Sequence, residues 1–313
     1  MGCCTEYVSV KIARAMILIM LLAGCGQSPE QQAMQHAESL LGEGQLDGAL
    51  AVVEAYLVAN PAALPVRRQR VMIFLRAERL DLATGAIDEL PTGDPVLLQA
   101  LRHRDPGVRA SASKLLINRP RAVRVAAIVK GMDDSSPTVR RNCARVAQSL
   151  KDPVFLKPLF RSLQDPDWQV RAEAADALGC MGEPRAAGWL IVRLRDQDRF
   201  VQFRAAQALR AVACDENRET LARALTLPHQ KYGFDIAVAL AKLGDERALG
   251  PLTNAVSDVD RDVRRRAAEA LGLSGQHSAT NALNVLLADA DPDVRDQARL
   301  AWNALVAKPP PAH

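Results

Sequence analysis

Hydrophobic positions recur along most of the chain with a period of 31 residues. The residues four, seven and eight positions after each node of this lattice are mostly Ala or Leu, so they share one helical face with the node. Valine occupies six of the seven nodes and Tyr232 occupies the other; the valines are Val108, Val139, Val170, Val201, Val263 and Val294. The pattern predicts an all-α chain of helical hairpins that bury their apolar faces against each other.

Residues that favour the beginning or the end of a helix recur at fixed positions in the copies of the repeat. Three positions before the node stand residues that can cap a helix N-terminus, in six copies of seven; they are Asp105, Ser136, Asp167, Asp198, Asp260 and Asp291, with His229 in the seventh. Pro106, Pro137 and Pro292 follow at the first helical position, where a missing N–H costs nothing. We expect the glycines after the apolar runs to end the helices; they are Gly179, Gly182, Gly244 and Gly272.

Two copies are especially clear. Residues 167–171 read DWQVR and are followed by Ala174, Ala177, Leu178 and Gly179, and residues 260–272 read DRDVRRRAAEALG. This pattern resembles the HEAT-like repeats first associated with phycobilisome lyases, and seven copies cover residues 97–306. The resemblance implies an α-α superhelix (solenoid) whose stability is a sum of nearest-neighbour interactions.

Two charged rows run through the copies. Five positions before the node stand Asp134, Asp165, Asp196, Asp258 and Asp289, and one position after it stand Arg109, Arg140, Arg171, Arg264 and Arg295. One interpretation is a row of catalytic acids facing a row of cations. The other is a structural Asp–Arg ladder between successive turns, which we favour because a catalytic site would not be copied in every repeat.

Residues 32–96 follow a different period. Leu46, Asp47, Ala49, Val53 and Pro61 return 34 residues later as Leu80, Asp81, Ala83, Ile87 and Pro95. The spacing resembles two tetratricopeptide motifs, although aliphatic residues stand at most of the aromatic positions. The tail, residues 307–313, is rich in proline and favours a polyproline conformation.

The N-terminus resembles the signal of a bacterial lipoprotein. Lys11 and Arg14 precede a nine-residue apolar run, residues 15–23, which is too short to span a bilayer as a helix. It ends in Leu-Ala-Gly-Cys at residues 22–25, which looks like a lipobox; the competing interpretation is a buried helix with an incidental cysteine. The resemblance implies a signal peptide at residues 1–24, a lipidated Cys25 bearing acyl chains such as palmitate, and a linker at 25–31. Because Gly26 rather than Asp follows, we expect the periplasmic face of the outer membrane.

The net charge and the spacing of the cysteines and histidines limit the kinds of partner and site that we expect. The net charge of +4, with both signs interleaved, gives no reason to expect nucleic acid as a partner. Cys143, Cys180 and Cys214 lack CxxC spacing, and we expect buried core thiols rather than a disulfide or redox site. None of the five histidines forms a His-Glu pair, the iron-binding signature of HEAT-like deoxyhypusine hydroxylases. We therefore expect no metal, no cofactor and no catalytic residues.

The remaining candidate site is a surface. Positions two, three and six after the node should face the groove that such solenoids use for partners. The candidate partner-binding residues are Arg141, Arg145, Phe203, Arg204, Lys231, Tyr232, Phe234, Arg265 and Arg266. Aromatic residues flanked by arginines are typical of binding hot spots. Two alternatives stay open: the Phe side chains fill gaps between hairpins, and the irregular copy around Tyr232 reflects drift.

These observations favour a non-catalytic, membrane-anchored scaffold or adaptor that binds other envelope proteins through its groove, with no small-molecule substrate. An alternative is a client-binding chaperone or maturation factor for an envelope complex. A HEAT-like lyase or hydroxylase is the least favoured reading, since bilin lyases work in a different compartment from the one that the signal implies.

Overall fold

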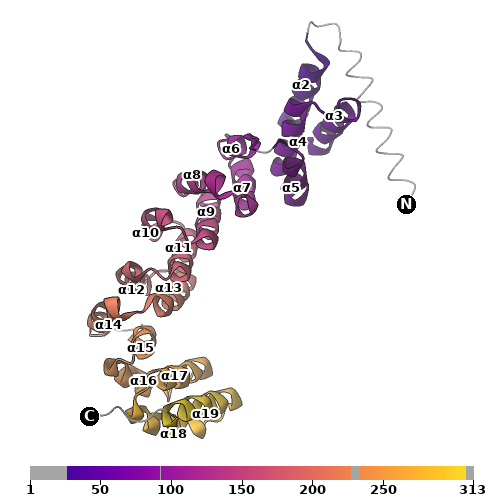
Figure 1. Ribbon diagram of the computed structural model, residues 1–313. Coiled ribbons are helices and arrows are strands. Elements are labelled where there is room, and N and C mark those ends of the chain that lie inside the picture. The colour runs from indigo at the N-terminus through magenta and orange to yellow at the C-terminus, as the bar shows by residue number, and fades with distance from the viewer. Residues whose placement is uncertain (1–26, 92, 227–232, 308–313) are drawn as a thin grey trace. The chain divides into compact units, whose positions relative to one another are not determined.

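The computed structural model describes residues 27–91, 93–226 and 233–307 (Figure 1). Within this part there are 18 α-helices, six short 3-10 helices and no β-strand, which confirms the predicted all-α class. The chain divides into two compact units, residues 1–146 and 147–313. Each unit consists of stacked helical hairpins. The predicted signal peptide, Cys25 and the end of the Pro-rich tail lie outside the described residues.

The first unit begins with two hairpins and continues into shorter helices. Its elements are α2 (Pro29–Gly42), α3 (Leu46–Ala59), α4 (Leu64–Arg76), α5 (Leu80–Asp88), α6 (Val96–Ala100), α7 (Pro106–Leu115), the 3-10 turn Leu116–Asn118, α8 (Arg121–Gly131) and the start of α9 (Pro137–Leu150). A core of small and β-branched residues, including Ala37, Ala49 and Val53, is fully buried between α2, α3 and α4.

The predicted change of repeat type at residues 96 and 97 does not coincide with the boundary between the compact units. Both sides of it belong to the first unit. Arg76 at the end of α4 lies 3.9 Å, Nε to Oδ2, from Asp105, which caps α7. The last hairpin of the 34-residue period therefore packs directly onto the first copy of the 31-residue period.

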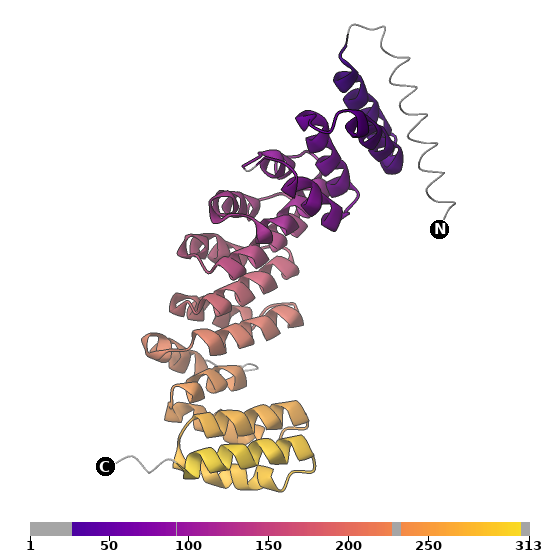
Figure 2. The same cartoon turned by 45° about the vertical axis from the view of Figure 1, so that its right-hand side comes forward.

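The second unit repeats a short first helix and a longer second helix. The first helices are α10 (Leu156–Ser162), α12 (Ala187–Arg193), α14 (Arg218–Leu225), α16 (Leu249–Ala255) and α18 (Thr280–Leu287), and 3-10 turns lead into them at Pro153–Phe155, Pro184–Ala186, Asp215–Asn217, Glu246–Ala248 and His277–Ala279. The second helices are α11 (Trp168–Met181), α13 (Arg199–Val212), α15 (Gly233–Lys242), α17 (Arg261–Leu273) and α19 (Pro292–Val306). Within this unit the second helices lie side by side, and the first helices line the other side (Figure 2).

The lattice explains why these helices form and stack. Five of the six node valines are at most 1% exposed, and Val263 is half-buried. The side chains of the predicted caps accept hydrogen bonds from first-turn N–H groups; these caps are Asp105, Asp167, Asp198, Asp260 and Asp291. Capping and full burial of the node valine therefore coincide in the copies of Asp105, Asp167, Asp198 and Asp291.

The glycines serve two different purposes. Gly182 and Gly244 adopt left-handed backbone angles, with φ of +65° and +68°, and stand where α11 and α15 have ended. The expectation that Gly179 and Gly272 end helices is wrong, because α11 and α17 continue through them. A Cβ at Gly179 would lie 2.7 Å from Ala208 Cα, and one at Gly272 would lie 2.7 Å from Ala301 Cβ. These two glycines let neighbouring second helices approach closely.

The cysteines differ in exposure. Cys143 is buried as expected, but Cys180 is exposed and Cys214 is half-buried, so the expectation of three buried thiols is wrong. Cys180 lies near the C-terminal end of α11, where its Sγ accepts a hydrogen bond from Gln148 Nε2 at 2.9 Å. All three thiols are free. In the part of the chain that the structure describes, no helix has the length and apolar character needed to cross a membrane.

Candidate protein-binding groove

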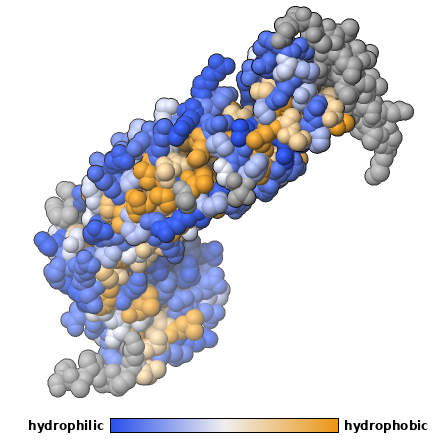
Figure 3. Space-filling view, turned by 45° about the horizontal axis from the view of Figure 1, so that its top comes forward, coloured by the Kyte–Doolittle hydropathy of each residue, from blue (hydrophilic) through white to orange (hydrophobic). Residues whose placement is uncertain are grey.

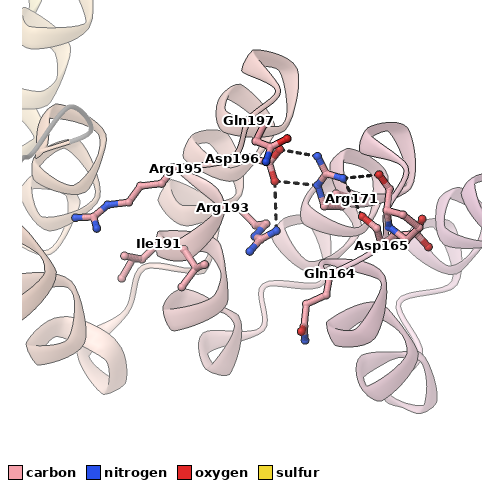
Figure 4. Close-up of a pocket in the computed structure, with 10 residues that line it drawn as sticks. Gln164, Asp165, Arg171, Ile191, Arg193, Arg195, Asp196 and Gln197 are labelled. Carbon is pink, nitrogen blue, oxygen red and sulfur yellow. Dashed lines mark hydrogen bonds and ion pairs between the residues drawn. The ribbon is translucent and has the colours of Figure 1, made fainter.

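Arg–Asp pairs join successive copies of the repeat. Arg171 donates to Asp196 through two parallel hydrogen bonds, Nε to Oδ2 at 2.8 Å and Nη2 to Oδ1 at 2.7 Å (Figure 4). Its remaining nitrogen, Nη1, donates to the carbonyl oxygens of Asp165 at 2.8 Å and Pro166 at 3.0 Å. One guanidinium therefore connects the loop before its own helix with the loop before the next second helix.

The same geometry recurs in both units. Arg109 binds Asp134 and Arg264 binds Asp289 in the same two-pronged way, at distances of 2.7–2.9 Å. Arg140 and Arg295 each donate Nη1 to two carbonyls of the preceding loop. The paired rows that the sequence places at fixed positions are thus a structural ladder at these three junctions.

The ladder carboxylates are held in the ionised form. Burial opposes ionisation of Asp134 and Asp196, but hydrogen bonds from their arginines and from a backbone N–H outweigh it, so the pKa of each carboxyl lies below its ordinary value. At Asp289 the hydrogen bond from Arg264 is the largest cause of the lowered pKa. An ionised carboxylate engaged by a guanidinium is a poor general acid near neutral pH, so these residues do not form a row of proton donors.

The ladder is interrupted around the irregular copy. Gln202 stands where the other copies have Arg, and its Nε2 donates to the Asp196 carbonyl at 2.6 Å, reproducing one bond of the missing guanidinium. Gly233 replaces the next arginine and has no side chain that could reach Asp258. Asp258 keeps its local role, because its Oδ1 accepts from Asp260 N at 2.9 Å. The junctions on either side of α15 therefore lack the two-pronged Arg–Asp pair of the ladder, although Arg266 on α17 pairs with Asp235 on α15 by a different geometry.

A groove opens beside this interruption, between α13, α15 and α17. We call it the second-helix groove; its volume is about 460 Å³, and it is lined by Arg199, Gln202, Phe203, Ala206, Gln207, Arg210, Asp235, Arg265, Arg266 and Glu269. Three of the predicted partner-binding residues, Phe203, Arg265 and Arg266, meet in it. Phe203 is 53% exposed. The alternative that this side chain fills a gap between hairpins is therefore wrong.

Ion pairs neutralise part of the groove. Arg210 Nη2 on α13 lies 3.0 Å from Glu269 Oε1 on α17, although the two residues are 59 positions apart. Arg266 pairs with Asp235 and also lies over the Phe234 ring, 4.9 Å from its centroid.

Two cations of the groove have weak partners or none. Arg265 lies 3.9 Å, Nε to Oδ1, from the exposed Asp262. Among the described residues no carboxylate lies within ion-pair distance of Arg199. One part of the groove thus combines an exposed Phe203 with two available cations.

Exposed aromatic rings continue from Phe203 along the N-terminal ends of α13 and α11. The Phe200 ring lies 6.5 Å from that of Phe203 and 5.8 Å, edge to face, from that of Trp168. Trp168 is 40% exposed and Phe200 is 45% exposed. Arg204 lies over Phe200, 5.0 Å from the ring centroid. The predicted residue Arg204 therefore contacts the cluster through cation–π attraction.

Sequence reasoning missed Trp168 and Phe200. Both directly precede the lattice node by one or two residues, on the first turn of a second helix. Two positions before the node the other described copies have Pro or Arg, and one position before it they have small, polar or charged residues such as Thr138, Asp262 and Gly107. An aromatic residue at a position where no other described copy has one could have indicated this cluster.

Other predicted residues do not join the groove. Arg141 and Arg145 belong to α9 and to the first unit, where Arg145 is exposed. Lys231 and Tyr232 lie outside the described residues. Phe234 is half-buried under Arg266. Among the described residues no group of three His, Cys, Asp or Glu side chains is placed to hold a metal ion.

Comparisons with known proteins identify the repeat. Solved structures of the same fold include an engineered protein, which is 18% identical with a TM-score of 0.52 and is matched over 95% of this chain and 99% of its own. The Escherichia coli protein YibA is 15% identical with a TM-score of 0.52, over 89% and 96% of the two chains. A chain of the CpcE–CpcF complex of phycocyanin lyase from Nostoc sp. PCC7120 is 20% identical, with a TM-score of 0.40, over 69% and 96%.

These structural similarities concern the fold alone. No curated protein matches the sequence significantly. The family of HEAT repeats matches residues 94–166, 125–210, 156–233 and 219–303, which together make up more than half of the chain. With its capped hairpins, its buried valine lattice and its Arg–Asp ladder, the chain belongs to the HEAT-repeat family.

Proposed function

We propose that the protein is a non-catalytic scaffold or adaptor that binds another protein of the cell envelope in the second-helix groove. The observation that carries this proposal is the exposed Phe203, which lies among available arginines and next to two further exposed rings. Aromatic and Arg side chains are enriched at the energetic centres of protein interfaces. The helical-repeat fold is compatible with such a role, although fold alone does not establish it.

The groove indicates the chemistry of the partner. Arg210 and Arg266 have close carboxylate partners, whereas Arg265 has only the 3.9 Å contact with the exposed Asp262 and Arg199 has no carboxylate within ion-pair distance among the described residues. A segment that places an apolar side chain on Phe203 and a carboxylate near each of these two arginines would fit both features. We therefore expect an acidic segment with an apolar anchor residue, and charge complementarity of this kind speeds encounter and excludes basic partners.

Site-specific photo-crosslinking in native membranes tests the site. A photoreactive phenylalanine analogue replaces Phe203, and the control carries it at Leu300 on α19, which is 65% exposed. We expect a discrete adduct from position 203 that disappears when Arg199 and Arg265 are both changed to Glu. Equal adducts from both positions, or none from position 203, would contradict the proposal.

The lipid anchor and the envelope location are part of the same proposal. They are supported by the order of basic residues, apolar run, small residues and thiol that ends at Cys25. A protein held at a membrane by two or more acyl chains stays there, and tethering raises its local concentration toward partners on the same surface. Metabolic labelling with palmitate should mark the wild type and not Cys25→Ala. Equal labelling of the two would refute the anchor, without bearing on the groove.

Two alternatives predict different behaviour. A chaperone or maturation factor would use the same groove for transient clients, so adducts from position 203 would change from one client to another. A HEAT-like lyase or hydroxylase would require bound metal or cofactor, which elemental and mass analysis of the purified protein would detect. The likeness of the first two hairpins to tetratricopeptide motifs stays a prediction.

A further inference from the structure

A second apolar surface lies on the first helices of the second unit. It is a shallow cavity of about 520 Å³ between the 3-10 turn Pro153–Phe155, α10 and α12. We call it the first-helix patch; the described residues that line it are Pro153, Val154, Leu156, Lys157, Phe160, Arg161, Gln164, Arg185 and Trp189. It shares no lining residue with the second-helix groove.

Large apolar side chains face solvent in and beside this patch. Trp189 is 42% exposed, and its ring lies 6.0 Å from that of Phe160, centroid to centroid. Val154 is 47% exposed, and Val192, one turn after Trp189 on α12, is 54% exposed. Scattered apolar residues are normal on a protein surface, but a contiguous group that includes a tryptophan indicates an interaction site. The space-filling view shows hydrophobic residues gathered into patches within a hydrophilic surface (Figure 3).

The charged side chains that line the patch are all basic. Lys157, Arg161 and Arg185 line it, and no carboxylate does among the described residues. Glu183 pairs with Arg185 from outside the lining, with Nε and Oε1 2.6 Å apart. The second-helix groove differs, because Asp235 and Glu269 stand among its arginines.

We propose that the first-helix patch binds the surface of an anionic phospholipid bilayer. Tryptophan is favoured at the depth of lipid headgroups, where its ring is apolar and its N–H can reach polar groups. Basic side chains such as Lys157 would bind headgroup phosphates, and each Lys or Arg near an anionic surface adds about fivefold to the affinity unless a carboxylate already pairs with it, as Glu183 does with Arg185. The valines beside Trp189 would enter the boundary between headgroups and acyl chains.

The composition favours a bilayer over a protein partner. Protein interfaces are depleted in Lys at their centres, whereas Lys157 lines the patch. Surfaces that lie on membranes combine Trp or Phe with Lys and Arg. Such contact would leave the second-helix groove, on the other helix layer, open to its partner. The inference rests on the patch alone and holds whether or not the groove binds the proposed segment.

Tryptophan fluorescence distinguishes the two layers in the full-length protein reconstituted on vesicles. The chain has three tryptophans, Trp168, Trp189 and Trp302. In the double variant Trp168→Phe, Trp302→Phe the emission reports on the first-helix patch. In the matched control Trp189→Phe, Trp302→Phe it reports on Trp168, which is equally exposed. The vesicles contain brominated phosphatidylethanolamine, with or without phosphatidylglycerol.

We expect Trp189 emission to be quenched on vesicles with phosphatidylglycerol and not on vesicles without it, and Trp168 emission to be unaffected on both. Adding Lys157→Glu should weaken the association at least about fivefold without changing helicity. Three results would overturn the proposal: no quenching of Trp189 on anionic vesicles, equal quenching of both tryptophans, or equal quenching on both kinds of vesicle. A protein partner covering the patch would give the first of these.

Discussion

Arg171 and Asp196 stand 25 residues apart and are joined by two parallel hydrogen bonds of 2.8 and 2.7 Å. The Asp196 side chain is 3% exposed, and that of Arg171 is 12% exposed. Asp196 also accepts from the backbone N–H of Asp198, at 3.1 Å, and so fixes the loop that precedes α13. Charge pairing, loop closure and the register of two successive copies therefore depend on one carboxylate.

Asp196→Asn should destabilise the protein by about 2 kcal/mol, because Asn keeps an acceptor for the loop N–H but leaves the Arg171 charge without its partner. Chemical unfolding monitored by circular dichroism measures the loss. The matched control is Asp258→Asn, since Asp258 makes the same loop hydrogen bond but Gly233 stands at the repeat position of its partner arginine. A cost at Asp258 as large as that at Asp196 would show that the loop, and not the ion pair, carries the energy.

Lowering the pH should reduce the contribution of the Asp–Arg ladder to the free energy of unfolding. The pKa of Asp134 and that of Asp196 are lowered in the folded protein, so the unfolded chain takes up protons first as the pH falls. The stabilisation is complete above the ordinary Asp pKa of about 4 and is lost as the pH falls toward the lowered folded values. Unfolding free energies measured from neutral pH to about pH 3 should decline less steeply in Asp196→Asn. Identical declines would exclude a contribution of this carboxyl.

Close approach of second helices should make Gly179→Ala costly. The added Cβ would lie 2.7 Å from Ala208 Cα and 2.8 Å from Ala208 Cβ, so α11 and α13 would have to separate. We expect a loss of about 1–3 kcal/mol. Gly250→Ala on α16 is the control, because its Cβ would meet nothing within 4 Å and Ala favours the helix. Thermal unfolding should shift down for the first variant and not for the second.

The cysteines should react with a thiol reagent to different extents in the native protein. Burial raises the pKa of the Cys143 thiol to about 12, and Cys143 is 0% exposed. Its Sγ occupies the space that a Cβ at Gly131 would need. Because the thiolate is the reactive form, a maleimide should label exposed Cys180 in the native protein and label Cys143 only after denaturation. Peptide mass mapping locates the label; rapid native labelling of Cys143 would show that α8 and α9 open readily.

Much of the fold could be predicted because each copy repeats the same physical requirements. The valine nodes, the aspartate caps and the alanine faces all point to hairpins that stack, and seven copies average out local irregularities. The glycines could not be assigned from the pattern alone. Gly179 and Gly182 both follow the same apolar run, and only the position of Ala208 shows that the first allows close packing while the second ends the helix.

The groove was predictable only in part. Position relative to the node placed Phe203, Arg265 and Arg266 on one side of their helices, and the structure brings them to one cavity. The bridge from Arg210 to Glu269 skips a whole copy, so no rule about neighbouring repeats could produce it. The first-helix patch was missed because Phe160 and Trp189 lie on short helices that lack the conspicuous node pattern.

The interruption of the ladder at Gln202 and Gly233 has a mechanical consequence. When the second unit is stretched along its length, junctions that hold a two-pronged Arg–Asp pair resist through short, directional hydrogen bonds. The junctions beside α15 lack these paired bonds and resist through apolar packing, the Arg266–Asp235 ion pair and the bridge from Arg210 to Glu269. The second-helix groove lies over the junctions that lack these paired bonds. A partner segment bound across α13 and α17 would connect the two helices, so the second unit would become stiffer when the partner is bound.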